Sequence, residues 1–321
     1  MRHRNLYLWA GIAVAALAIL FPHISPKFQL RMVTEIVIVT LLAMTWKMML
    51  NEAGLFSFGH AVYFGLGAYA SVLGWLHIKG LSLLSGIFLG GLVAGVIGFI
   101  LSAFLVRMSG TYYALLTLAF NQLIWAIVWK WRDVTGGDDG LGKFPKPDLL
   151  GISMKDPVNF YYLSLVVVAA SLFLCWYFTK TPLGSVMKSV KSNEERTKFI
   201  GFNVNASKLV FLTMLAFFAG ISGALYAQFQ EFIGASSIDL VMSTHVIFMA
   251  FIGGVGHFWG PLLGSGIYVY LSEYLSHYTD RWELIFGIVV VLLVLFAPQG
   301  ILGATGKKKE GGDGRRDRKA R

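Results

Sequence analysis

Long apolar runs separated by shorter polar connections occupy most of this chain. A helix needs about 20 apolar residues to cross the hydrocarbon core of a membrane, and the runs are close to this length. They predict an all-α membrane protein, a polytopic helical bundle of about ten spans, within a range of eight to eleven. The predicted spans cover residues 6–21, 32–50, 54–78, 81–106, 111–129, 160–178, 209–229, 241–256, 260–276 and 282–297.

Composition and charge agree with a membrane protein. Apolar residues make up 56% of the chain and charged residues only 14%, whereas soluble domains have roughly 25% charged residues. The net charge is +10, and eight of the 27 Lys and Arg residues lie in the tail 307–321. We interpret 307–321 as a disordered cytoplasmic tail near anionic lipid and 1–306 as the transmembrane domain. Nucleic-acid binding is not predicted, because no basic segment is interleaved with aromatic residues.

One long polar stretch between spans, residues 179–208, contains six Lys and Arg residues. Basic loops are retained on the cytoplasmic side, so we expect this stretch there. It follows the sixth of the ten predicted spans, so both termini lie on the same side of the membrane as this stretch. Within the stretch, Asn193 can cap a short helix whose first turn contains Glu194 and Glu195. Gly201 then ends this helix, because glycine adopts the left-handed conformation of a C-cap. Such a helix is suited to contact a soluble motor subunit.

The connection 131–159 lies on the opposite, external side in this topology. It is rich in Gly, Pro and Asp, and its acidic residues include Asp133, Asp138 and Asp139. Loops of this length are often either functional or disordered. Two interpretations are open, a flexible connector and a docking surface for an external soluble protein.

Glycine is frequent, with 36 residues, many of them inside apolar runs. Stripes of small residues allow helices to approach closely, so packing is the first interpretation. The sequence around Gly59-His60 is echoed around Gly256-His257. This echo predicts an internal repeat with glycine-broken helices, as in many transporters.

Polar residues inside spans are costly and indicate either a pathway or a bond between helices. The pathway candidates are His60, Asn121, Gln122 and His245. Ser222 with His245 also suggests an intramembrane serine protease, but the sequence around this histidine lacks the expected glycines. No metal cluster and no phosphate-binding loop is recognisable, so no cofactor is expected and any ATP would be bound by partner subunits.

Several stretches together resemble the LivM-type permeases, which are membrane subunits of ABC importers for branched-chain amino acids. The matching stretches are 54–61 (GLFSFGHA), 65–69 (GLGAY), 110–120 (GTYYALLTLAF), 135–141 (TGGDDGL), 181–184 (TPLG) and 193–196 (NEER). Similarity continues through 251–256 and 298–303, and it covers about residues 32–303. The resemblance implies a multi-pass protein of the prokaryotic plasma (inner) membrane that transports leucine, isoleucine or valine.

The resemblance also implies partners: a homologous second permease, two ABC ATPase subunits and an external substrate-binding protein. The ATPase would contact the loop at Glu194, Glu195, Arg196 and Gly201. ABC importers generally have Glu-Ala-Ala-x-x-x-Gly here; this chain keeps the spacing from Glu195 to Gly201 but lacks both alanines. The alternatives are a permease for urea or short-chain amides and an ion-coupled secondary transporter.

Overall fold

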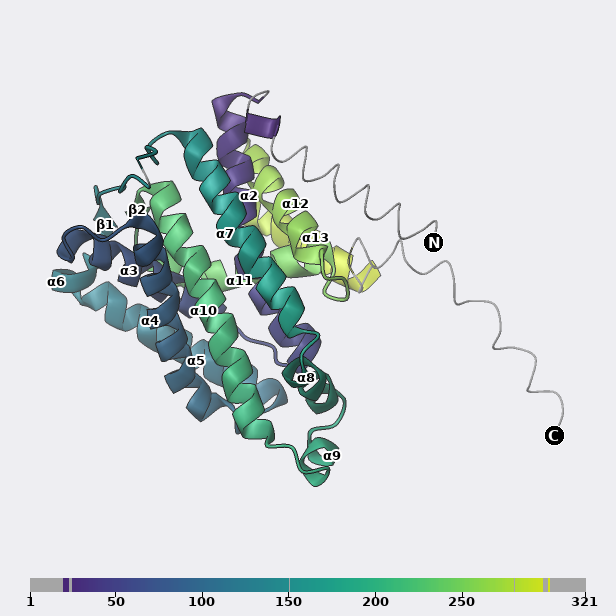
Figure 1. The fold of residues 1–321 in the computed structure, drawn as a ribbon. Coiled ribbons are helices and arrows are strands. Elements are labelled where there is room, and N and C mark those ends of the chain that lie inside the picture. Colours follow the sequence, from purple (N-terminus) through teal and green to yellow (C-terminus); the bar gives the residue numbers. More distant parts are fainter. Residues whose placement is uncertain (1–19, 23–24, 150, 280, 297–299, 301–321) are drawn as a thin grey trace, which may run out of the picture.

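The computed structural model describes residues 20–22, 25–149, 151–279, 281–296 and 300. These residues form helices almost throughout (Figure 1). The longer helices are α2 (Lys27–Ala53), α3 (His60–His77), α4 (Leu83–Leu105), α5 (Gly110–Lys130), α7 (Pro157–Phe178), α8 (Pro182–Ser192), α10 (Val204–Gln230), α11 (Leu240–Gly253), α12 (Gly260–Ser276) and α13 (Trp282–Phe296). The short elements are α6 (Arg132–Thr135), α9 (Glu194–Phe199), the 3-10 helix η1 (Ala235–Ser237) and two paired strands, β1 (Leu141–Gly142) and β2 (Phe232–Ile233).

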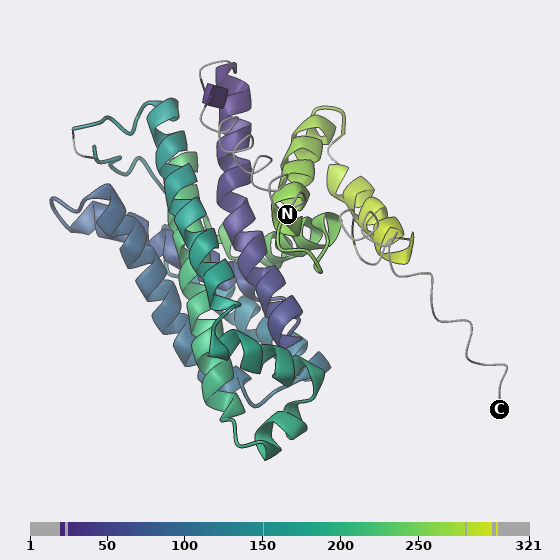
Figure 2. The same ribbon diagram turned by 45° about the vertical axis from the view of Figure 1, so that its right-hand side comes forward.

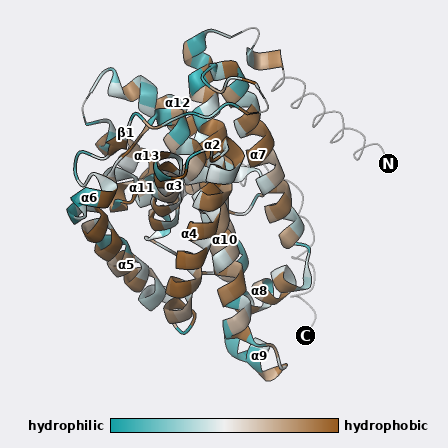
Figure 3. Ribbon diagram, turned by 60° about the vertical axis from the view of Figure 1, so that its left-hand side comes forward, coloured by the Kyte–Doolittle hydropathy of each residue, from teal (hydrophilic) through white to brown (hydrophobic). Residues whose placement is uncertain are grey.

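Five described helices are long and apolar enough to cross a membrane, namely α2, α4, α5, α7 and α10. Figure 3 shows their apolar bodies between more polar ends. The all-α membrane class therefore fits, whereas the count of about ten spans is not confirmed. The predicted span 54–78 is not one helix, because 54–59 is irregular and α3 begins only at His60. Residues 6–19 of the predicted first span, and the tail 307–321, lie outside the described residues.

The 27-residue helices α2 and α10 form the centre of the bundle (Figures 1 and 2). They run in opposite directions, since α2 ends and α10 begins beside α8 and α9. Helices α3 and α4 pack against α10, and α7 packs against α2. Helices α11, α12 and α13 form a second group that contacts α2 mainly through α11 and α12. The least buried of the five long helices is α5.

Glycines bring α3, α4 and α10 into close contact, as the small-residue stripes predicted. A methyl group at Gly67 of α3 would overlap the backbone of Gly220 on α10, and one at Gly223 would overlap the carbonyl of Phe64. Gly90 of α4 in turn approaches the carbonyl of Gly67. Close backbone approach maximises van der Waals contact, which drives helix association in a membrane.

Both central helices are followed by an irregular segment that folds back into the bundle. Gly54 ends α2 in the left-handed conformation (φ 69°), and 54–59 then returns along α2, where Trp46 Nε1 donates to the carbonyl of Ser57 at 2.8 Å. After α10, the chain returns along α3, because Ile238 packs where a side chain at Gly65 would lie. Helices α3 and α11 thus both begin inside the bundle.

In this arrangement the counterpart of α3 is α11. The sequence comparison instead matches Gly59-His60 with Gly256-His257. His60 is the fully buried first residue of α3, whereas His257 is exposed in the turn between α11 and α12. The resemblance of these two Gly-His pairs is therefore not a structural equivalence. A long helix followed by a return segment and a shorter helix occurs twice, in opposite directions. An inverted repeat of this form is a prediction that these elements support.

Candidate functional site

A helical hairpin of α8 and α9 projects from the end of the bundle opposite the β1–β2 ladder (Figure 1). Helix α8 was not predicted from the sequence. Its signals are nevertheless present: Thr181 accepts a hydrogen bond from the amide of Gly184, and Pro182 occupies the first turn. Val186, Met187 and Val190 follow at helical spacing and are buried against the bundle. Helix α8 is therefore an amphipathic helix packed on the protein.

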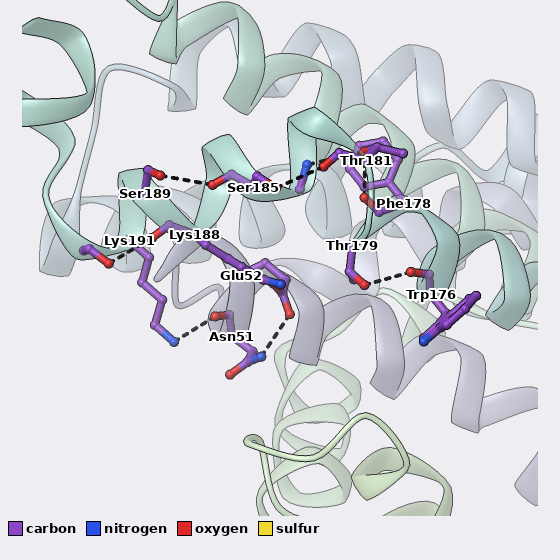
Figure 4. Close-up of polar contacts among 12 residues, drawn as sticks. Asn51, Glu52, Trp176, Phe178, Thr179, Thr181, Ser185, Lys188, Ser189 and Lys191 are labelled. Atoms are coloured by element: carbon purple, nitrogen blue, oxygen red, sulfur yellow. Dashed lines mark hydrogen bonds and ion pairs between the residues drawn. The ribbon is translucent and has the colours of Figure 1, made fainter. Parts of the chain in front are cut away.

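Two lysines attach α8 to the end of α2 (Figure 4). Lys191 Nζ donates to the backbone carbonyl of Asn51 at 2.7 Å, and Lys188 lies 3.5 Å from the carboxylate of Glu52. The end of α2 is also where the chain turns back at Gly54, whose α-carbon faces the side chain of Lys191. The hairpin thus contacts the segment that leads into α3.

Helix α9 has the cap that its sequence predicted. The side chain of Asn193 accepts from the amide of Arg196 at 2.8 Å, and Gly201 follows the helix with φ 99°. Glu194 binds two lysines, Lys198 at 2.8 Å and Lys208 at 2.7 Å. Burial raises the pKa of Glu194. The hydrogen bonds and charges of Lys198 and Lys208 together lower it by more, so its net pKa lies below the ordinary value.

The four residues expected to contact an ATPase have different positions. Glu195 and Arg196 are exposed, as is Gly201, whereas Glu194 is half-buried and occupied by the two lysines. At one of the two missing alanine positions, Thr197 is buried and donates to the carbonyl of Asn193 at 2.8 Å. This position, which lacks the alanine, is thus a packing position in this chain.

The described part of the connection 131–159 is folded onto the end of the bundle opposite the hairpin. Its strand β1 pairs with β2 after α10, and Lys146 lies 3.4 Å from the carboxylate of Glu231 and 4.4 Å from the ring centre of Phe160. Asp133, Asp138 and Asp139 are exposed there. Asp138 accepts from the indole of Trp129 at 3.2 Å. The described part of this connection is tied to α10 by these contacts.

A buried polar cluster joins α2, α3, α5 and α11 inside the bundle. Ser243 of α11 accepts from the amide of Ala61 at 3.2 Å and donates to Asn121 at 3.4 Å. The neighbouring His60 has its Nε2 2.8 Å from the hydroxyl of Thr45. His60, Asn121, Ser243 and Thr45 are all 0% exposed.

Two polar atoms of the cluster, Asn121 Nδ2 and His60 Nδ1, have no hydrogen-bond partner among the described residues. The other two pathway candidates lie elsewhere. Gln122 is half-buried on α5, and His245 packs against Tyr268 and Trp282. Ser222 donates to the carbonyl of Ile38 at 2.7 Å, a contact between α10 and α2.

The hairpin and the buried polar cluster both contain residues that were not predicted from the sequence. In the hairpin these are Lys208 and Glu52, and in the cluster Ser243 and Thr45. Lys208 carried a signal, because a cation two residues before the long apolar run 210–227 needs a partner if it is buried. Ser243 carried none, since serine inside a helix commonly bonds its own backbone.

Comparison with known proteins now decides the family. A profile of the family described as the permease component of the branched-chain amino acid transport system matches residues 29–297. The chain belongs to this family. The permease is 26% identical over 317 residues to the high-affinity branched-chain amino acid transport system permease protein LivM of Salmonella typhimurium, covering 92% of this chain and 74% of the relative.

Two further relatives widen the comparison. The permease is 23% identical to a probable branched-chain amino acid transport permease protein LivH of Methanocaldococcus jannaschii, covering 76% of this chain and 84% of the relative. It is 24% identical to the ribose import permease protein RbsC of Haemophilus influenzae, covering 65% of each chain. No solved structure matches the permease significantly. The family is thus shown by sequence, and the relatives to which this chain is similar are named for different substrates.

Proposed function

We propose that this permease is one membrane subunit of an ATP-driven importer for leucine, isoleucine and valine. The observation that carries the proposal is the family match over residues 29–297, together with five apolar helices and a helical hairpin projecting beyond their ends. Separate ATPase subunits bind the hairpin and supply the energy. An external binding protein delivers the amino acid at the opposite end.

The charges orient the permease in an inner membrane. Lys180, Lys188, Lys191, Arg196 and Lys198 lie on or beside the hairpin, so that end faces the cytoplasm by the positive-inside rule. Together with the first predicted span 6–21 and the shorter helices α3 and α11–α13, this gives about ten crossings with both termini cytoplasmic. The exposed Asp133, Asp138 and Asp139 then face outward and contribute to the surface that receives the binding protein.

A second permease completes the pathway. Likeness to both a LivM and a LivH protein suggests two related permeases side by side. The weakly buried helix α5 is suited to this contact, because its half-buried Gln122 is costly to leave facing lipid. On its inner side α5 contributes Asn121 to the buried polar cluster. A pathway between the two permeases would therefore be controlled by the position of α5.

Reconstitution tests the function directly. The tagged permease is purified together with the proteins that bind it, and the whole complex is placed in liposomes. The proposal expects ATP-dependent uptake of leucine, isoleucine and valine that requires the binding protein, with no uptake of ribose or urea. Uptake by the permease alone under an ion gradient would overturn it in favour of a secondary transporter. Substituting Asp138 and Asp139 with Asn should lower stimulation by the binding protein, whereas Asp148→Asn in the same connection serves as the matched control.

A further inference from the structure

A cavity of about 340 Å³ lies between α2, α7 and α10, at the end of the bundle opposite the hairpin (Figures 1 and 2). Its charged lining residues come from three parts of the chain: Arg31 of α2, Lys146 and Lys155 of the connection that precedes α7, and Glu231 directly after α10. Three cations thus share the cavity with one carboxylate, which leaves its lining with a net charge of +2.

Lys146 is a nearly buried cation without full compensation. Its side chain is 12% exposed, and its one ion pair among the described residues is the 3.4 Å contact with Glu231, whose side chain is 70% exposed. Burial lowers the pKa of Lys146. The charge and hydrogen bond of Glu231 raise it in part and the charge of Arg31 lowers it again, so the net pKa lies below the ordinary value. Because a charge taken out of water is costly unless it is paired, these surroundings favour a further negative charge.

The other two cations have no close counter-charge in the described parts of the chain. Neither Arg31 nor Lys155 forms an ion pair within 4.0 Å there. Asp156, next to Lys155, caps α7 by accepting from a backbone amide at 3.0 Å, and Glu35, one turn farther along α2, does not line the cavity. Residues 1–26, which precede α2, contain no Asp or Glu. The preceding segment therefore has no carboxylate side chain with which to neutralise the cavity.

We propose that Arg31, Lys146 and Lys155 bind a phosphate group in this cavity, and that the phosphate belongs to an anionic membrane lipid. An arginine guanidinium can form two parallel hydrogen bonds to a phosphate, and a lysine ammonium binds it as a point charge. A phosphate has several acceptor oxygens, so three cations can contact it together. The cavity volume is near the lower end of the range for ligand sites, which suits a head group rather than a large molecule.

The position of the cavity favours a lipid as the source of the phosphate. Helices α2, α7 and α10 are all long and apolar enough to cross a membrane, so their ends lie at the level of the lipid head groups. Basic pockets between membrane helices bind the head groups of acidic lipids. Phe160 and Phe229 also line the cavity and offer apolar contact to the glycerol part of a lipid, which a free phosphate lacks. In the orientation proposed above, this lipid lies in the outer leaflet.

A bound phosphate would join the ends of three helices. Arg31 lies near the beginning of α2, Lys155 directly precedes α7, and Lys146 is paired with Glu231 at the end of α10. A ligand that binds only the folded protein raises its melting temperature. The lipid would therefore stabilise this end of the bundle.

Lipid retention tests the site. The full-length permease is purified from nanodiscs that contain equal amounts of dioleoyl-phosphatidylglycerol and dioleoyl-phosphatidylcholine, and native mass spectrometry counts the lipids that remain bound. The two lipids have the same acyl chains and differ in head-group charge. We expect phosphatidylglycerol to be retained in about tenfold excess or more. The double variant Arg31→Gln with Lys155→Gln should lose most of this excess.

Two further variants separate the cavity from general surface charge and from misfolding. Lys79→Gln with Lys130→Gln is the matched control, because both lysines are exposed at the same end of the bundle and lie outside the cavity. It should keep the excess of phosphatidylglycerol. Glu231→Gln removes the one carboxylate of the lining and should increase this excess about fivefold, a gain that a misfolded protein would not show. Size-exclusion chromatography checks the folding of each variant.

Inorganic phosphate distinguishes the two sources of the ligand. In nanodiscs of phosphatidylcholine alone, a melting temperature several degrees higher in phosphate than in chloride of equal ionic strength, without any excess of phosphatidylglycerol, would keep the cavity as a phosphate site but overturn the lipid. The absence of both effects would overturn the site altogether, as would an equal loss of phosphatidylglycerol in the control pair or no gain in Glu231→Gln. Because none of these measurements uses transport, the proposed function stands or falls separately.

Discussion

The ammonium group of Lys208 lies 2.7 Å from a carboxylate oxygen of Glu194, and its side chain is only 1% exposed. This ion pair joins α9 to the beginning of α10. Removing one partner of a buried pair leaves an uncompensated charge, which costs about 3–5 kcal/mol. Glu194 therefore fixes the hairpin to α10. By doing so it positions the exposed residues of α9.

Replacement of Glu194 by Gln should loosen the hairpin and lower ATP-driven uptake. Because the cost comes from the unpaired ammonium, the double variant Glu194→Gln with Lys208→Met should recover part of the lost thermal stability. Lys198→Met is the matched control, since Lys198 binds the same carboxylate but is 52% exposed, and exposed pairs contribute only about 0–1 kcal/mol. Melting temperatures and uptake rates of the four proteins check this. A loss of thermal stability in Lys198→Met as large as that in Glu194→Gln would contradict the assignment.

The same pair predicts a pH dependence. The pKa of Glu194 is lowered from its ordinary value of 4.5 in the folded protein. A lowered pKa means that its ionised form contributes stability that is complete above the ordinary value and is lost as the pH falls through the folded value. The melting-temperature difference between wild type and Glu194→Gln should therefore stay constant from neutral pH to about 5 and shrink only below 4.5. A difference that already shrinks between pH 7 and pH 6 would point to another group.

Substitution at the glycine contact of α4 and α10 should prevent correct packing. A side chain at Gly220 would meet Ala94 and the backbone of Gly90, and forced overpacking costs typically 1–3 kcal/mol or more. We expect Gly220→Val to aggregate or to melt several degrees lower in fluorescence-detected size-exclusion chromatography. Gly266→Val is the control, because nothing lies within 4 Å of a side chain there. Similar melting temperatures for both variants would show that the close approach is unimportant.

The sequence predicted the features that depend on local chemistry. Apolar length identified α2, α4, α5, α7 and α10 as spans, and Asn193 with Gly201 identified both ends of α9. These predictions succeed because hydropathy and capping act over one or two turns. The cap of α8 at Thr181 was equally local, and its amphipathic spacing could have been recognised in the same way.

Features that depend on tertiary contacts were not predictable. A continuous helix over 54–78 has acceptable hydropathy, yet the chain turns back at Gly54 and bonds to Trp46 before α3 begins. Of the four pathway candidates, His60 and Asn121 belong to the buried polar cluster, whereas His245 lies apart from it. Their common partner, Ser243, lies 122 residues from Asn121 in the chain, so no local pattern could indicate it.

Asn121 offers the sharpest test of the pathway. Its Nδ2 is buried without a hydrogen-bond partner among the described residues, and such a group costs about 1–3 kcal/mol. Replacement by Leu, which has a similar shape, removes this unpaired amide but also the acceptor of the Ser243 hydroxyl, so the two effects oppose each other and the melting temperature should change little. If the amide contacts the transported molecule when the pathway opens, uptake should fall about tenfold with the ATPase still bound. Ser164→Ala is the control, because the Ser164 hydroxyl on α7 is equally buried and unpaired in the described structure but lies outside the cluster. Normal uptake by Asn121→Leu would assign Asn121 to helix packing, and equal losses in both variants would indicate a general effect of altering buried polar groups.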